Sequence, residues 1–294
     1  MTDTRSFDEI YADVPADQRA DLADFRAAHP PQHAQIDGMD WEYLVGGTGE
    51  ETVLLLVGGL KVADAAYRSM PMLEDTFNVI TPSYPAIPTI TGLADGLAAL
   101  LDAAGVARAH VLAGSFGGML AQVFVRRHPQ RVARLVLSTT AVFDTDTADR
   151  HRTLLNAFGP ADEATVLSMA KEQVFATIAP IESLHAFYRA YLDELYSQRL
   201  TKHDLVTLYQ ALLDFAENVQ LSASDLDGWG GEVLILESND DEIFDAKTRA
   251  AVRALYPSAH TYTFHGAGHS PGTNQRDLYF KVVNGFLRAG EVPN

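Results

Sequence analysis

Cysteine is absent from the 294-residue sequence. Disulfide bonds, thiolate metal sites and a cysteine nucleophile are therefore excluded. Apolar residues make up 47 % of the chain, yet no uninterrupted apolar run reaches the roughly 18 residues that a membrane-spanning helix needs. The sequence predicts a globular protein with a large core and without a membrane partner.

Basic residues are scarce. The chain has 22 lysines and arginines against 39 aspartates and glutamates, which gives a formal net charge of −17. Such a charge repels polyanions, so nucleic acids and anionic membranes are not expected as partners. The acidic start, MTDTRSFDEIYADVPADQ, lacks the basic-then-apolar pattern of a signal peptide, and we expect a cytoplasmic location.

Apolar runs alternate with amphipathic segments through much of the chain. Strands are predicted at residues 41–47, 52–59, 77–82, 109–114, 132–140, 232–238 and 259–265. Helices are predicted at residues 89–106, 116–129, 245–255 and 275–289. This alternation is typical of an α/β fold in which helices cover both faces of a mostly parallel sheet.

Two segments have no strand pattern. Residues 145–225 read as consecutive helices, which predicts an all-helical cap inserted between two strands of the sheet. Residues 1–30, helical over 6–28, are predicted to form an N-terminal extension. The α/β core is then expected to comprise residues 31–144 and 226–294.

A serine stands at the junction of a predicted strand and a predicted helix. Residues 113–117 read Ala-Gly-Ser-Phe-Gly, close to the G-x-S-x-G elbow, with Ala113 in the first small position. A sharp turn there exposes the hydroxyl of Ser115. It also points the first amides of the helix, from Phe116 onward, at developing negative charge. The alternative is an ordinary helix-capping serine in a glycine-rich turn.

Two later loops carry the other groups that acyl-transfer chemistry needs. A cluster of carboxylates ends the predicted strand in LILESNDDEIF (234–244), and the glycine-flanked His269 follows the last predicted strand. The order serine, acid, histidine is that of the elbow-bearing hydrolase fold. Each loop also follows the carboxyl end of a strand, where open parallel sheets place their sites.

With these motifs the chain resembles the α/β-hydrolase superfamily over residues ~33–290. The stretch FNVITPSYP…LLDAAGVARAHVLAGSFGGMLAQVFVRRHPQRVARLVLSTT resembles the maspardin-like branch in particular. The resemblance implies that Ser115 is the nucleophile and His269 the general base. The family's G-x-x-D acid loop matches Ser238-Asn239-Asp240-Asp241, which implies Asp241 as the acid, with Asp240 as the alternative.

The family also has an oxyanion loop after its first central strand, commonly beginning His-Gly. Here the loop reads VGGLKVAD, with Val57 in place of the histidine and Gly58 matching the glycine. The resemblance implies that the amides of Gly59 and Phe116 form the oxyanion hole. The alternative for the two glycines is a plain turn that ends the strand.

Two nearby side chains are candidates for substrate binding beside Gly58. Lys61 could bind a substrate carboxylate or lie exposed at the surface, and Tyr84 could line the pocket or pack in the core. The histidines show no H-E-x-x-H or comparable spacing, so we expect neither a metal nor a diffusible cofactor.

The cap is rich in aromatic residues, which predicts an apolar cover over the site. They are Phe158, Phe175, Phe187, Tyr188, Tyr191, Tyr196 and Tyr209. We therefore expect a small-molecule substrate, a small or medium apolar carboxylic ester, cleaved through an acyl-enzyme. The sequence does not distinguish esters from lactones, thioesters, amides or carbon–carbon bonds, since one triad serves several of them.

Two other functions stay open. A catalytically weak or inactive binding protein could use the same scaffold, because fold does not fix function. An aminopeptidase of this fold would need an acidic subsite, for which Asp193, Glu194 and Asp214 of the predicted cap are candidates. The cap or the N-terminal extension could also mediate a homodimer.

Overall fold

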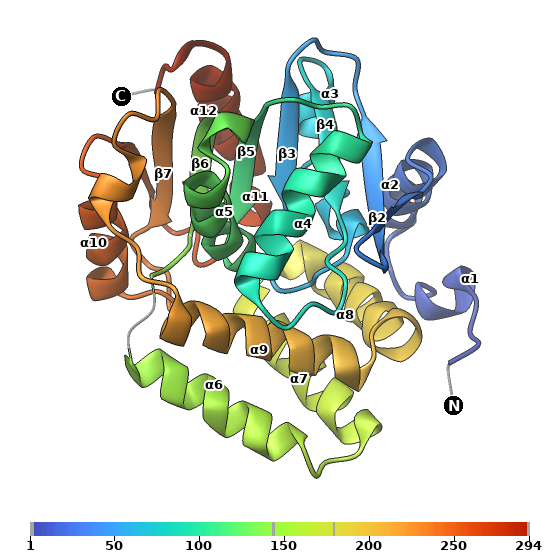
Figure 1. Ribbon diagram of the computed structural model, residues 1–294. Coiled ribbons are helices and arrows are strands. Elements are labelled where there is room, and N and C mark those ends of the chain that lie inside the picture. The colour runs from blue at the N-terminus through green and yellow to red at the C-terminus, as the bar shows by residue number, and fades with distance from the viewer. Residues whose placement is uncertain (1–2, 143–144, 179, 293–294) are drawn as a thin grey trace.

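A central eight-stranded sheet organises the computed structural model, which describes residues 3–142, 145–178 and 180–292. The strand order is β1-β2-β4-β3-β5-β6-β7-β8, antiparallel between β1, β2 and β4 and parallel elsewhere (Figure 1). The strands are β1 (Gln32–Ile36), β2 (Met39–Gly46), β3 (Thr52–Leu56), β4 (Asn78–Pro82), β5 (Ala109–Gly114), β6 (Val132–Ser138), β7 (Glu232–Ser238) and β8 (His260–Phe264). The sheet is mostly parallel, as the alternation of the sequence predicts.

Helices surround the sheet in chain order. They are α1 (Phe7–Ile10), α2 (Ala16–Ala28), α3 (Pro71–Glu74), α4 (Ile90–Ala103), α5 (Phe116–Arg127), α6 (Thr145–Phe158), α7 (Glu163–Ile178), α8 (His185–Glu194), α9 (Lys202–Asn218), α10 (Ala246–Leu255), α11 (Pro271–Asn274) and α12 (Arg276–Ala289). In the part of the chain that the structure describes, no helix combines the length and the hydrophobicity needed to cross a bilayer.

The central strands are buried on both faces. Every residue of β3 is buried, and its side chains alternate between two hydrophobic clusters. Leu54 and Leu56 pack with residues of α4 and α5 on one face, whereas Val53 and Leu55 pack with α3 and α12 on the other. Figure 1 shows α4 and α5 in front of the sheet and α12 behind it. A continuous apolar run is the sequence pattern of such a strand.

One glycine inside a helix has a packing cause. A Cβ on Gly96, in the middle of α4, would lie 2.1 Å from the ring of Trp41. Trp41 of β2 is fully buried, so the glycine lets the largest aromatic side chain of this face approach the helix backbone. The closer packing offsets the roughly 1 kcal/mol by which glycine disfavours a helix interior.

Helices α6 to α9 lie between β6 and β7 in the sequence and form a separate group of helices in space. Figure 1 shows them together at one end of the sheet, with α9 next to the lower end of α4. The first turn of α9 is fixed by a capping box in which Thr201 and Asp204 bond each other's backbone amides. Further along α9, the Asp214 carboxylate accepts a hydrogen bond from the amide of Ile90 at the start of α4.

The N-terminal region differs from the expectation in two ways. The segment 6–28 is not one helix, because Tyr11 ends α1 and Pro15 precedes α2. Strand β1 was not predicted, yet it pairs with β2 through a hairpin at Asp37-Gly38, both of which have positive φ. An Asp-Gly pair of this kind is the usual signal for a two-residue hairpin.

Candidate active site

Ser115 occupies a strained turn between β5 and α5. Its φ is 50° and its ψ is −120°, a conformation that residues other than glycine rarely adopt. The amide of Ser115 donates to the carbonyl oxygen of Ser138 at 3.0 Å, and the Thr140 hydroxyl donates to the carbonyl oxygen of Ser115 at 2.8 Å. Neighbouring strand β6 and the residues after it therefore hold the turn, in the manner of a nucleophile elbow.

Two glycines after the serine let the helix approach the sheet. A Cβ on Gly117 would lie 2.5 Å from the carbonyl oxygens of Leu56 and Val57, and a Cβ on Gly118 would lie 2.6 Å from the Thr140 side chain. A larger residue at position 117 would push α5 away from the end of β3, and one at position 118 would push it away from the residues that follow β6. The elbow pattern is thus explained by packing as well as by backbone conformation.

The structure brings the three residues of the predicted triad together. The Ser115 Oγ lies 3.1 Å from the His269 Nε2, and the His269 Nδ1 lies 3.0 and 3.1 Å from the two carboxylate oxygens of Asp241. The side chains of His269 and Asp241 are only 8 % and 1 % exposed. The loops after β5, β7 and β8 supply one residue each, at the carboxyl edge of the sheet where sites of parallel sheets form.

The two adjacent aspartates have different surroundings. The Asp241 carboxylate accepts hydrogen bonds from the amides of Ile243 and Phe244 at 2.8 and 3.1 Å, which leaves it aimed at His269. The exposed Asp240 turns instead to the backbone of the histidine loop, where it accepts from the amides of Ala267 and Gly268. Asp241, not Asp240, therefore contacts the imidazole.

Gly58 and Gly59 line the same cavity as Ser115, and Phe116 follows Ser115 in the chain. Gly58 lies beside the elbow, since a Cβ built on it would be 3.5 Å from the Cβ of Ser115. Within the described part of the chain, the amides of Gly59 and Phe116 donate to no protein acceptor. Free amides next to a nucleophile can receive the negative charge of a tetrahedral intermediate.

The expectation that Lys61 and Tyr84 contact substrate is corrected by the structure. Lys61 is 3 % exposed, and its ammonium donates to the carbonyl oxygen of Asp204 at 3.0 Å and lies 3.4 Å from that carboxylate. Burial lowers the pKa of Lys61, and the charge of Asp204 only partly offsets this. The alternative of an exposed lysine is equally wrong, because the side chain joins the loop after β3 to the first turn of α9.

Tyr84 packs in the core and supports the same loop through two hydrogen bonds. Its hydroxyl donates to the carbonyl oxygen of Val57 at 2.7 Å, and its amide donates to the carbonyl oxygen of Lys61 at 2.8 Å. The ring packs edge-on against Phe116. Tyr84 is 4 % exposed and does not line the cavity, so its role is to hold both ends of the loop that carries Gly58 and Gly59.

A cavity of about 310 Å³ opens at Ser115 and His269. Its walls come from the sheet, from the loop after β3, from α7 and α8 and from the α11 region, and most of the lining is apolar. Of the aromatic residues named for the cap, Tyr188 and Tyr191 line the cavity. Among the described residues, none of the lining side chains is a lysine, an arginine or a carboxylate.

The described residues contain no group of three or more histidines, aspartates or glutamates that could hold a metal ion. The polar groups that line the cavity are instead hydroxyls, such as those of Ser69, Thr177 and Tyr188, together with the His269 imidazole. These groups can bind a neutral substrate through hydrogen bonds.

Comparison with known proteins decides the family. A model of the α/β-hydrolase fold family matches residues 51–272. The chain belongs to this family. This hydrolase is 28 % identical over 282 residues to the dihydrolipoyllysine-residue acetyltransferase component of the acetoin cleaving system of Cupriavidus necator, covering 92 % of this chain and 71 % of that protein. It is 25 % identical over 208 residues to the 2-hydroxymuconate semialdehyde hydrolase of Pseudomonas putida, covering 66 % and 67 % respectively.

Solved structures share the fold of this hydrolase. A hydrolase from Pseudomonas aeruginosa PA01 superposes with a TM-score of 0.74 at 22 % identity, covering 88 % of this chain and 99 % of that chain. A thermophilic esterase from Thermogutta terrifontis gives a TM-score of 0.71 at 21 % identity, covering 88 % and 98 %. Nearly the whole of each relative is thus matched, while part of this chain has no counterpart in them.

Proposed function

We propose that this hydrolase cleaves an uncharged carboxylic ester, or a related acyl compound, through an acyl-enzyme on Ser115. The observation that carries the proposal is the continuous hydrogen-bonded line from the Ser115 hydroxyl through His269 to Asp241. A serine is activated in this way when an imidazole accepts its proton and a carboxylate holds the imidazole.

The reaction follows from the positions of the three side chains. The Ser115 Oγ attacks the carbonyl carbon while its proton passes to the His269 Nε2, 3.1 Å away. Asp241 accepts a hydrogen bond from the Nδ1–H, which keeps the Nε2 free as the base and stabilises the imidazolium. The imidazolium then protonates the leaving alcohol, and a water molecule repeats the two steps on the acyl-enzyme.

The two free amides supply the remaining stabilisation. The negative oxygen of the tetrahedral intermediate would be held by the amides of Gly59 and Phe116, one from each loop beside the serine. Each donor of this kind contributes roughly 2.7–4 kcal/mol to transition-state stabilisation. Glycine at position 59 lets a substrate carbonyl approach the backbone closely.

The walls of the cavity support an uncharged acyl group. A substrate carboxylate would have no lysine or arginine to pair with among the described lining residues, and burying an unpaired charge is strongly unfavourable. The three carboxylates considered for an aminopeptidase subsite lie elsewhere. Asp193 pairs with Arg5 and Lys171, Glu194 pairs with Arg26, and Asp214 bonds the amide of Ile90.

The group that receives the acyl chain is open to test. The name of the Cupriavidus necator relative describes acetyl transfer and that of the Pseudomonas putida relative describes hydrolysis. Both reactions are compatible with an acyl-enzyme. They would differ in the nucleophile that attacks it, which is a thiol in acetyl transfer and water in hydrolysis. We propose water, because the polar groups of the cavity are small hydroxyls that can position it.

The principal alternative is a binding protein with little or no catalytic activity. The narrower resemblance to the maspardin-like branch and the valine in place of the usual histidine at position 57 leave room for it. The strained backbone of Ser115 argues for catalysis, since a capping serine needs no positive φ.

Hydrolysis of p-nitrophenyl butyrate by the wild type, S115A and H269A tests the proposal. We expect turnover by the wild type, with a first-turnover burst of about one p-nitrophenol per chain if deacylation is slower. The two variants should lose about 10⁴-fold or more in kcat. Hydrolysis of aminoacyl anilides alone would indicate a peptidase, and added dihydrolipoamide would reveal transfer to a thiol.

A further inference from the structure

Asp64 is a buried carboxylate that the proposed reaction does not use. It lies in a short 3₁₀ helix, Ala63–Ala66, that follows the oxyanion loop, and it is 7 % exposed. Its Oδ1 accepts a hydrogen bond from the hydroxyl of Tyr191 at 2.8 Å. Its Oδ2 accepts from Arg26 at 2.8 and 3.0 Å and from Arg199 at 2.6 Å.

Arg26 makes this cluster a junction between distant parts of the chain. It belongs to α2 and also donates to the carboxylate of Glu194, at the end of cap helix α8, at 2.9 and 3.1 Å. The hydroxyl of Tyr11 donates to the same carboxylate at 2.6 Å. The segment before the sheet therefore bonds both the loop region of the core and the cap, and it precedes residue 51, where the match to the family model begins.

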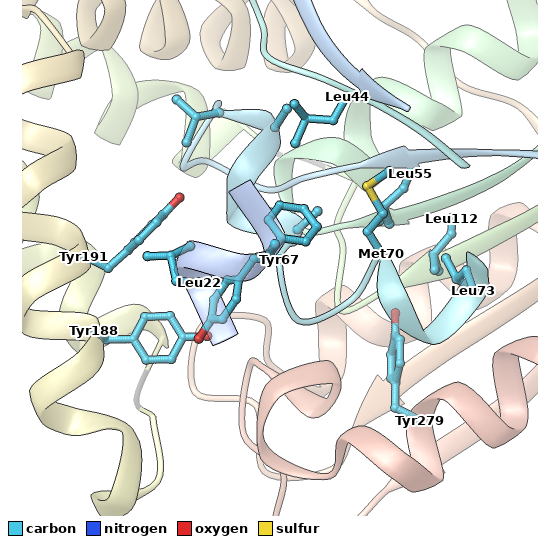
Figure 2. Close-up of a cluster of buried hydrophobic side chains, with 14 of the residues drawn as sticks. Leu22, Leu44, Leu55, Tyr67, Met70, Leu73, Leu112, Tyr188, Tyr191 and Tyr279 are labelled. Atoms are coloured by element: carbon cyan, nitrogen blue, oxygen red, sulfur yellow. The ribbon is translucent and has the colours of Figure 1, made fainter. Parts of the chain in front are cut away.

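The aromatic residues around Tyr191 continue this link to the active-site cavity. Tyr67, Tyr188 and Tyr191 all line the cavity. Figure 2 shows Tyr188 pointing from its helix toward Tyr67 and Tyr191 beside them, with Leu22 of α2 in the same cluster. The rings of Tyr191 and Phe187 stack with centroids 5.9 Å apart, and Phe187 in turn contacts Tyr11 at 6.1 Å.

A second cavity lies beyond the hydrogen bond between Tyr191 and Asp64. It measures about 260 Å³ and its lining includes Arg26, Asp64 and Arg199. Tyr191 lines the active-site cavity and Asp64 lines the second one, so their hydrogen bond crosses the wall between the two. If the ring moved, the space available to an acyl chain would increase.

We propose that α2 takes part in substrate selection: Arg26 holds Asp64, Asp64 holds the hydroxyl of Tyr191, and the fixed ring limits the length of the acyl chain. The inference rests on the ester hydrolysis proposed above. Arg26 and Asp64 are positioning residues, and Tyr191 is the residue that meets the substrate. Without Arg26, the Asp64 carboxylate would shift toward Arg199. The hydroxyl of Tyr191 would then either follow the carboxylate or lose its hydrogen bond to it, and in both cases the ring would move.

The test compares kcat/KM for p-nitrophenyl octanoate with that for p-nitrophenyl acetate. The ratio for one preparation does not depend on the fraction of folded protein, so a purely structural defect would leave it unchanged. We expect Tyr191→Ala to raise the ratio at least about tenfold, since a few methylenes in a pocket are worth that much. Tyr191→Phe and Arg26→Met should each raise it about threefold to tenfold, the worth of a hydrogen bond.

Two further variants make the test decisive. Arg19→Met, on the same helix but outside the cluster, should keep the wild-type ratio, and Arg26→Lys should give a smaller rise and serves if Arg26→Met does not fold. A wild-type ratio in both Arg26 variants would overturn the role of α2, and a wild-type ratio in Tyr191→Ala would overturn that of Tyr191. If the wild type does not cleave even the acetate, ester hydrolysis itself is refuted and this inference with it.

Discussion

The ammonium of Lys61 lies 3.0 Å from the carbonyl oxygen of Asp204, which joins the loop after β3 to the first turn of α9. Leu208 on the same helix lies near this loop, since a Cβ built on Gly59 would be 4.0 Å from its side chain. Because Lys61 has a φ of 66°, its backbone is held in the left-handed region that side chains disfavour. The loop after β3 is therefore bonded directly to α9.

Replacing Lys61 by methionine separates activity from stability. Lys61 is 3 % exposed, and burying its charge is unfavourable, which is also why burial lowers its pKa. In K61M, Asp204 still accepts hydrogen bonds from the hydroxyls of Thr201 and Thr207. Because the Asp204 side chain is 25 % exposed and keeps its bond from Thr201, we expect K61M to change the free energy of unfolding by only about 1 kcal/mol. Its kcat/KM should fall about 10- to 100-fold, because the loop loses its connection to α9.

The matched control is Lys202→Met at the start of the same helix. Lys202 bonds the carbonyl oxygens of Gly159 and Ala161 within the cap and does not touch the loop. Urea unfolding and ester kinetics are measured on both variants. Equal activity of K61M and K202M would show that the contact between cap and loop has no part in catalysis.

The two neighbouring aspartates should differ sharply when each is changed to asparagine. D241N leaves the wrong imidazole tautomer stabilised, and we expect kcat to fall about 10⁴-fold with little loss of stability. D240N weakens the bonds that Asp240 accepts from the amides of Ala267 and Gly268 and from the Ser238 hydroxyl, none of which involves His269. The site is exposed, so kcat should fall tenfold at most, about the worth of one hydrogen bond. Steady-state kinetics decide, and the opposite order of effects would move the acid of the triad to Asp240.

Tyr84→Phe tests the support of the oxyanion loop. The change removes the donor to the carbonyl oxygen of Val57 in a buried place, and this should lower the free energy of unfolding by about 1–3 kcal/mol. Gly58 and Gly59 follow Val57 directly, and the amide of Gly59 is proposed to stabilise the transition state. A looser loop should therefore lower kcat while KM stays nearly constant. Tyr209→Phe in the cap is the control, and a change in KM alone would place Tyr84 in substrate binding after all.

Asp64→Asn should have a stability cost that depends on pH. Burial raises the pKa of Asp64, but the charges of Arg199 and Arg26 and the bond from Tyr191 outweigh it and hold the pKa below its ordinary value. The ionised form therefore stabilises the fold above the pKa of an unfolded aspartate, about 3.9. This contribution is lost as the pH falls through the lower pKa of the folded state.

Urea unfolding of wild type and D64N at pH 7 and pH 3 measures this effect. We expect D64N to be less stable by about 1–3 kcal/mol at pH 7, since it removes the charge that the half-buried Arg26 and Arg199 share, while Arg26 keeps its bonds to Glu194. The difference should narrow at pH 3. A difference that is constant or widens toward acid would mean that Asp64 is not held ionised by the arginines.

The parts of the structure that follow from local signals could be predicted from the sequence. Two such signals are the continuous apolar run of β3 and the small residues around Ser115. In each case a few consecutive residues satisfy the structural requirement by themselves. The loops after β7 and β8 could be paired with Ser115 because parallel strands bring their carboxyl ends to one edge. This pairing of the loops with Ser115 did not require knowing the order of the strands in the sheet.

The roles of Lys61, Tyr84 and Asp64 depend on partners far away in the chain. Lys61 contacts a residue 143 positions later, and Asp64 joins Arg26 to Tyr191 across 165 positions of the sequence, from 26 to 191. No periodicity or motif encodes such contacts. From the sequence alone, a loop lysine such as Lys61 is therefore expected to be exposed. The hairpin of β1 is different, because Asp37-Gly38 was a local signal and could have been used.

The central claim is that the Ser115 hydroxyl is a nucleophile activated by His269. Intact-mass spectrometry after incubation with a fluorophosphonate measures this directly, with the modified peptide located by fragmentation. We predict one adduct per chain on Ser115 in the wild type, none in S115A and a rate at least about 10³-fold lower in H269A. A folded wild type that stays unmodified, or one modified at the same rate in H269A, would contradict the account.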